Sequence, residues 1–216
     1  MFDTLIDDTQ TFVRALARDN TRDWFDAHKA QYEGNLRDPA KALIEMVAPQ
    51  LSALTDLPVT GKLFRIHRDV RFSKDKTPYK THLHMMWTVQ SGTRQDPVLF
   101  FGINPDTVVV GTGMMEFTKD VLADWRKMAD LDGDYLAGKI KSVTDKGYAL
   151  WEPKLKRIPS PFDKDHAHGD LLRQKGLVAT GDLPRAGDLA DDITSALTDL
   201  WPLSDMLIGV AESPTI

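Results

Sequence analysis

The sequence predicts an α+β domain in which an antiparallel sheet is packed against helices from the N-terminal and C-terminal parts of the chain. The spacing of apolar residues is helical at first, alternates with a period of two in the middle, and becomes helical again. The strand-like segments follow one another through short turn-rich links, which favours hairpins over parallel βαβ units. A mixed sheet, whose C-terminal strands join in parallel, is the competing architecture.

Three helices are expected before the first strand. Residues 7–17 carry apolar side chains at helical spacing, and two aspartates suit the start of that helix. A second helix begins after Thr21 and ends near residues 34–35, where Gly and Asn favour termination. A third helix has Pro39 in its first turn, and Pro49 is expected to kink it.

The middle of the chain predicts four strands. Alternation of apolar and polar side chains defines the first two, and apolar runs around a tight turn define the others. The expected ranges are 63–72, 82–89, 98–103 and 107–111. Arg68 has the parity of the apolar side chains in the first range, so a regular strand would bury its guanidinium. We therefore expect either a carboxylate partner, with Asp75 and Asp163 as candidates, or a bulge that turns Arg68 outward.

Helices return in the last part of the chain. Two helices are expected over 118–129 and 136–143, followed by a short strand near Tyr148 and an irregular segment rich in proline. The remaining elements are a helical turn, a brief strand, an amphipathic helix that Pro202 breaks, and a last helical piece. Their expected ranges are 170–173, 177–179, 188–200 and 203–210.

Composition limits the class of protein. The 216 residues fit a single domain, 1–216, and the absence of cysteine excludes disulfides, zinc–thiolate centres and thiol nucleophiles. The first residues lack the basic-then-apolar order of a secretory signal, and no apolar run is long enough to span a bilayer. We therefore expect a cytoplasmic protein without a membrane partner. The net charge of −5 argues against a nucleic-acid coat, although a local basic patch could still bind nucleic acid.

One stretch, residues 63–81, reverses the charge of the chain. It holds six lysine and arginine residues against two aspartates, a local charge of about +4, which leaves about −9 for the rest. Such an island is either a site for an anion or an internal ion-pair network. Arginine suits bidentate recognition of phosphate or carboxylate, and lysine adds a point charge. The Gly-rich motif of a P-loop is absent.

The candidate residues divide into ligand contacts and scaffold. The predicted ligand-binding residues are Arg65, Arg71, Lys76, Tyr79, Lys80 and His82. The residues expected to form structural ion pairs are Arg68, Asp69, Asp75 and Asp163. Tyr79 and His82 are the candidate proton carriers if the site is enzymatic. The sequence defines no cofactor, and its two His-x-His pairs are weak grounds for a metal, so no metal site is predicted.

The spacing of these residues forms a pattern, Arg-x-x-Arg-Asp-x-Arg-Phe, then Asp followed by Lys, then Tyr. It falls on Arg65, Arg68, Asp69, Arg71, Phe72, Asp75, Lys76 and Tyr79. The pattern resembles the signature of a conserved hypothetical protein family, domain of unknown function 2461. Segments 20–25 and 155–175 resemble further elements of that family, so the resemblance covers nearly the whole chain. Ser160-Pro161 departs from it where Lys-Gly is expected, and the resemblance implies no established function.

Two functions fit the basic stretch. The first is binding of an anionic small molecule that carries phosphate or carboxylate, with or without catalysis. The alternative is a non-enzymatic interaction module for nucleic acid or an acidic protein partner, in which the charged signature is mainly a structural ion-pair network. The acidic remainder of the chain and the lack of an exposed basic helix argue against nucleic acid.

Overall fold

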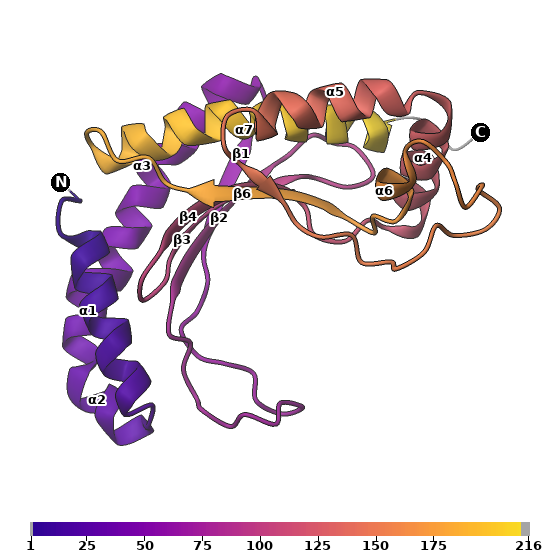
Figure 1. The fold of residues 1–216 in the computed structure, drawn as a ribbon. Coiled ribbons are helices and arrows are strands. Elements are labelled where there is room, and N and C mark those ends of the chain that lie inside the picture. The colour runs from indigo at the N-terminus through magenta and orange to yellow at the C-terminus, as the bar shows by residue number, and fades with distance from the viewer. Residues whose placement is uncertain (1, 213–216) are drawn as a thin grey trace.

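The computed structural model describes residues 2–212, and its central feature is a six-stranded sheet (Figure 1). The strands are β1 (Val59–Leu63), β2 (Leu83–Val89), β3 (Val98–Ile103), β4 (Val108–Met114), β5 (Ala149–Leu150) and β6 (Leu177–Asp182). They lie in the order β1-β2-β3-β4-β6-β5, and all neighbours are antiparallel. The α+β class with an antiparallel sheet is confirmed. The mixed alternative is wrong, because β6 joins β4 in the antiparallel sense.

Helices precede and follow these strands, and α3 and α7 lie along one face of the sheet (Figure 1). The helices are α1 (Leu5–Arg18), α2 (Arg22–Gln31), η1 (Tyr32–Arg37, π-helical), α3 (Asp38–Thr55), α4 (Lys119–Leu131), α5 (Gly133–Thr144), α6 (Gly169–Leu172) and α7 (Leu189–Glu212). None of the helices within residues 2–212 is both long and apolar enough to cross a membrane.

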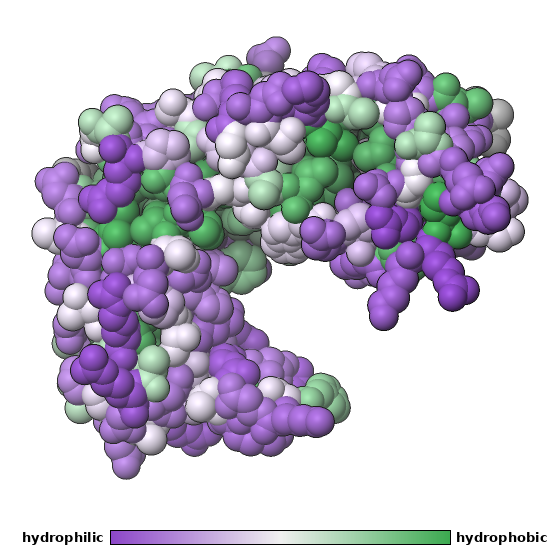
Figure 2. Space-filling model, in the orientation of Figure 1, coloured by the Kyte–Doolittle hydropathy of each residue, from purple (hydrophilic) through white to green (hydrophobic). Residues whose placement is uncertain are grey.

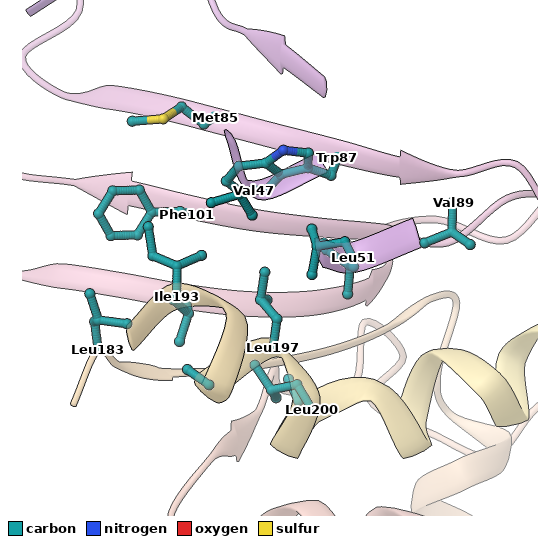
Figure 3. Close-up of a cluster of buried hydrophobic side chains, with 14 of the residues drawn as sticks. Val47, Leu51, Met85, Trp87, Val89, Phe101, Leu183, Ile193, Leu197 and Leu200 are labelled. Carbon is teal, nitrogen blue, oxygen red and sulfur yellow. The ribbon is translucent and has the colours of Figure 1, made fainter. Parts of the chain in front are cut away.

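The two faces of the sheet differ in burial. The odd-numbered residues of β2 are buried and the even-numbered ones are partly exposed, as their alternation predicts. The buried side chains meet Leu51 of α3 and Leu197 of α7 in the core (Figure 3). Trp87 is fully buried there and donates its indole N–H to the backbone oxygen of Ile44 at 3.2 Å. Burial of a large apolar side chain contributes about 1.5–3 kcal/mol, so the face that packs against α3 and α7 stabilises the fold. The opposite face of β2 is partly exposed to solvent.

Two predicted helix ends are wrong. The second helix does not end at residues 34–35, because α2 continues through the π-helical η1 directly into α3. Pro202 does not break the last helix, because α7 is continuous from Leu189 to Glu212. Proline removes one backbone hydrogen bond, but α7 has buried apolar residues on both sides of it, and their packing keeps the helix intact.

The strand predicted over 63–72 is also wrong. β1 ends one residue into that range, and residues 64–82 form a hairpin arm that extends away from the sheet between β1 and β2 (Figure 1). A single β-bridge, between His67 and Tyr79, joins the two sides of the arm. The alternating pattern therefore reflects extended backbone outside the sheet. Arg68 consequently does not enter the apolar face on which its parity would place it.

Candidate functional site

The arm is anchored to the helices through Tyr79. This residue is 4 % exposed, and its ring stacks on Phe25 of α2 with the centroids 4.2 Å apart. Asn20, between α1 and α2, donates from Nδ2 to the backbone oxygen of Tyr79 at 3.0 Å and accepts from its backbone N–H at 3.1 Å. Burial raises the pKa of the Tyr79 phenol. The ring stacking and the two backbone hydrogen bonds give Tyr79 an anchoring position.

The tip of the arm, residues 68–77, pairs its arginines with its own aspartates. Arg68 contacts Asp75 with 2.5 Å between Nη1 and Oδ2, and donates to the backbone oxygen of Thr77 at 3.1 Å. Asp75 also accepts from the backbone N–H of Thr77 at 2.9 Å. These contacts lower the pKa of the Asp75 carboxyl to about 2, the backbone hydrogen bond from Thr77 most and the Arg68 guanidinium next. Arg68 thus has one of the two partners that the sequence proposed for it.

Two further cations of the tip, Arg71 and Lys76, also have oxygen partners. Arg71 donates to Asp69 through two groups, with 2.9 Å between Nε and Oδ1 and 2.7 Å between Nη2 and Oδ2, and these hydrogen bonds lower the pKa of the Asp69 carboxyl. Lys76 donates to the backbone oxygen of Val70 at 2.9 Å. The Arg71 side chain is 77 % exposed, and exposed pairs of this kind contribute little to stability. Arg71 and Lys76, both predicted ligand contacts, therefore have partners within the arm.

The base of the arm, residues 62–65 and 80–84, is built differently. Lys62 and Lys80 both lie over the ring of Phe64, each with its ammonium 5.5 Å from the ring centroid. Burial lowers the pKa of Lys80, and the nearby charges of Arg65 and Lys62 lower it further. Among residues 2–212, no ion pair forms to Lys62, Arg65 or Lys80. The base therefore carries positive charge that this part of the chain does not neutralise.

A bulge places two histidines beside these cations. Two backbone hydrogen bonds, from Phe64 to His84 at 3.0 Å and from Lys80 to Ile66 at 2.8 Å, enclose it. Between these two hydrogen bonds, Arg65 on one side of the arm lies opposite three residues, 81–83, on the other side. Bulges bend a strand and change the direction of its side chains, and they are frequent next to functional sites.

The two imidazoles are stacked and neutral at pH 7. The rings of His82 and His84 have centroids 4.2 Å apart. Desolvation lowers the pKa of His82 to about 4, with smaller effects of His84 and Lys80, and desolvation lowers the pKa of His84 as well. The His84 ring occupies space over Gly102, where a Cβ would lie 2.6 Å from it. Three basic groups with lowered pKa values thus meet at one place, a pattern typical of functional sites.

A hollow of about 320 Å³, the arm hollow, lies between the arm and the turn that joins α1 to α2. Its polar lining includes Asn20, Arg68, Asp75, Lys80 and His82. A volume of this order suits a small ligand. The structure therefore brings together three predicted ligand contacts, Tyr79, Lys80 and His82, with the predicted ion pair of Arg68 and Asp75.

The other predicted contacts lie elsewhere. Arg65 lines a second hollow of about 300 Å³ on the side of the arm that faces α2 and η1. Arg71 and Lys76 lie at the tip and line neither of these hollows. Asp163, expected in the ion-pair network, instead accepts a hydrogen bond from the backbone N–H of Asp165 at 2.9 Å. This aspartate lies in the late loop, residues 151–168, and does not pair with Arg68. Arg68 pairs instead with Asp75 of its own arm.

The late loop and α6 form a larger hollow of about 710 Å³. Its basic lining residues are Lys156, Arg157, Lys164, His166, His168 and Arg173. His166 and His168 are fixed by Asp130 and Asp134, with 3.2 Å between Nε2 and Oδ1 in each pair. The two His-x-His pairs of the sequence thus lie in separate places. In the part of the chain that the structure describes, no three His, Asp or Glu side chains are grouped so as to hold a metal ion.

Nearly all of the chain matches one family model. The family is described as conserved hypothetical protein (DUF2461), and the match covers residues 8–208. The chain belongs to this family. The resemblance that the arm signature indicated is therefore confirmed, and in this DUF2461 protein the signature residues form the arm. A search of curated proteins found no match.

Sequence reasoning missed several residues of the candidate site. Lys62 lies in β1 and was missed because the strand was predicted to begin at residue 63. Phe64 follows β1 and was predicted to be an apolar residue of a regular strand. Asn20 belongs to the early segment that resembles the family, which was a usable signal, but its hydrogen bonds to Tyr79 span 59 positions of sequence. Local patterns do not report contacts over such separations.

Proposed function

We propose that the arm hollow binds the phosphate or carboxylate group of a small molecule. The observation that carries this proposal is the environment of Lys80. Its ammonium is partly buried, its pKa is lowered by burial, Arg65 and Lys62, and no carboxylate among residues 2–212 pairs with it. An anion in the hollow would supply the missing opposite charge, so binding would relieve an unfavourable feature of the free protein.

Arg68, which also lines the hollow, supports the same ligand chemistry. Within the described chain its side-chain hydrogen bonds all involve Nη1, which leaves Nε and Nη2 for ligand oxygens. Asp75 keeps the guanidinium in place while neutralising part of its charge. A guanidinium held in this way can recognise a phosphate or carboxylate with two parallel hydrogen bonds.

The enzymatic form of the proposal assigns proton transfer to His82. Its pKa of about 4 keeps the imidazole neutral at pH 7, and a bound anion would raise that pKa toward the working pH by favouring the charged form. Tyr79 has no part in this chemistry, because its ring is packed against Phe25 and its phenol has a raised pKa. The paired charges of the tip then serve as scaffold for the hollow.

The test is a thermal-shift panel of orthophosphate, citrate and sugar phosphates at millimolar concentration. A ligand that fits should raise the Tm by several degrees, since ligand at 100 times its Kd stabilises by about 2.7 kcal/mol. Lys80→Met should weaken that ligand by about 10- to 100-fold, because a charged hydrogen bond is lost.

The matched control is Lys74→Met, which removes the same charge from an exposed lysine of the tip that does not line the arm hollow. It should leave ligand binding unchanged. A flat panel with the unmodified protein, or equal weakening by both substitutions, would contradict the proposal.

A further inference from the structure

The sheet face opposite α3 and α7 presents a continuous row of side chains. Strand register aligns, from β1 to β6, Lys62, Met86, Phe100, Gly111 and Thr180. Met86 and Phe100 are partly exposed. The Phe100 ring lies over Gly111, where a Cβ would come within 2.3 Å of it, so the glycine makes room for the ring against the sheet. This face, the open face, therefore has an aromatic and thioether surface at its centre.

The β1 edge of the open face is cationic. Phe64 follows β1 with the parity of Lys62, and its backbone N–H bonds to the backbone oxygen of His84 at 3.0 Å, so it extends the open face by one residue pair. Lys62 and Lys80 lie over its ring. This edge thus combines an aromatic ring with two ammonium groups for which no ion pair is found among residues 2–212.

The β5 edge has the same two components. Trp151 follows β5, donates its backbone N–H to Val178 of β6 at 2.9 Å, and is 45 % exposed. The register of β5 on β6 gives it the parity of Ala149, which faces Thr180 on the open face. The chain then enters the late loop, where Lys156 and Arg157 line the larger hollow and form no ion pair within residues 2–212.

The two edges are too far apart for one small anion to contact both. Five steps of about 4.8 Å between neighbouring strands separate them by roughly 24 Å. The space-filling view shows a broad concavity between the arm and the region of the late loop, below the sheet (Figure 2). Register places one carboxylate, Asp182, on the open face within the described strands, beside Val109. A ligand that contacts both edges must therefore be an extended polyanion.

We propose that single-stranded nucleic acid binds across the open face, with bases stacked on Phe64, Phe100 and Trp151 and phosphates at the lysines and arginine of the two edges. Base stacking on aromatic rings combined with a cationic path is how single strands are bound without sequence preference. A duplex does not expose base faces for stacking, and an acidic peptide gains little from three aromatic rings. The inference rests on the proposed function, because the phosphate held at Lys80 would be one phosphate of the strand.

The primary test is fluorescence anisotropy with labelled oligothymidylates at low salt. A strand of about ten nucleotides should bind more tightly than a dinucleotide, because only the longer one reaches both edges. The logarithm of its affinity should fall with the logarithm of salt concentration, by about 0.7 per phosphate contacted. Phe100→Leu keeps an apolar side chain but removes the ring, and it should weaken the longer strand by about 5- to 100-fold.

The edge contacts have their own variant. Arg157→Gln at the far edge should weaken the longer strand and reduce the salt slope by about 0.7, while the dinucleotide is unaffected. Lys141→Gln on α5 removes a positive charge from an exposed lysine of a helix packed against α7, and it should change neither quantity.

The outcomes separate this inference from the proposed function. If orthophosphate stabilises the protein and that shift disappears in Lys80→Met, but oligothymidylate does not bind, the arm hollow stands and the open-face inference is overturned. If neither binds, both are overturned. Equal binding of a polyglutamate peptide would replace nucleic acid with an acidic protein partner. No effect of Phe100→Leu on oligothymidylate binding would overturn the stacking of bases across the open face.

Discussion

Within the arm, the tip and the base both gather cations. The tip gives every arginine an oxygen partner, whereas at the base no carboxylate of residues 2–212 pairs with Lys80. At the tip, Arg68 and Arg71 contact Asp75 and Asp69, and all four residues come from one short segment. At the base, Lys80 is surrounded by further positive charge and by neutral imidazoles. The sequence is rich in positive charge at both places, and only the contacts of each cation distinguish the tip from the proposed site.

The energetic consequences differ accordingly. Exposed ion pairs such as those at the tip gain little over solvation by water, so they can order a loop without contributing much stability. A partly buried ammonium without a carboxylate partner destabilises the folded protein. Unfavourable groups of this kind are found most often at binding sites, where a ligand compensates them. The following predictions compare the tip with the rest of the arm, beginning with the largest expected effect.

Two aromatic residues give the sharpest contrast. Tyr79→Ala should lower the free energy of unfolding by about 3–5 kcal/mol, because it removes a buried ring stacked on Phe25. Phe72→Ala at the tip should change it by less than about 0.5 kcal/mol, since that side chain is 95 % exposed. Urea denaturation measures both, and Tyr79→Phe should retain most of the stability. Similar losses for the two alanine variants would show that the tip is also packed.

Acid should affect the base before the tip. The pKa of His82 is lowered from 6.5 to about 4, so the unfolded chain binds a proton below pH 6.5 that the folded protein does not bind. Stability is therefore complete above pH 6.5 and falls between pH 6.5 and 4, by about 1–2 kcal/mol after allowance for solvent screening of a half-buried group. His84 contributes in the same direction.

At the tip, the pKa of Asp75 is lowered from 3.8 to about 2, so its contribution is complete above pH 3.8 and is lost between pH 3.8 and 2. Urea denaturation at successive pH values from 7 to 4 should show a slope that His82→Asn reduces and Asp75→Asn leaves unchanged. An unchanged slope in His82→Asn would mean that the base does not titrate in this range.

The smallest expected effect is a difference in the direction of the Tm change between two substitutions. In the absence of ligand, Lys80→Met should leave the Tm unchanged or raise it slightly, because it removes repulsion from Arg65 and Lys62. Arg68→Met should lower the Tm, by a few degrees at most, because it breaks an ion pair that is mostly exposed at Asp75. Thermal denaturation at neutral pH compares them. A loss in Lys80→Met as large as that in Arg68→Met would assign Lys80 to the scaffold.

The sequence predicted the strands that are buried on one face. The range expected for β3 is the observed one, and β2 begins one residue later than expected. The prediction works here because burial that alternates along a strand produces a local alternation of apolar and polar residues. β1 was displaced because its sequence, Val-Thr-Gly-Lys-Leu, has little apolar character. Glycine is required at position 61 because a Cβ there would lie 2.1 Å from the Ile44 side chain of α3. A contact between segments so far apart cannot be predicted from the local sequence pattern.

By itself the sequence determined the α+β class, the DUF2461 signature and the clustering of positive charge in one stretch. It also put forward Lys80 within that stretch and His82 directly after it as candidates. These properties depend on residue type and on short-range period. The tertiary structure decided which cations have partners, because Asn20 and α2 position the arm and a bulge brings His82 onto His84. It also decided that the arm and the late loop lie at opposite edges of one open face, since the order of strands in a sheet is set by packing between distant segments.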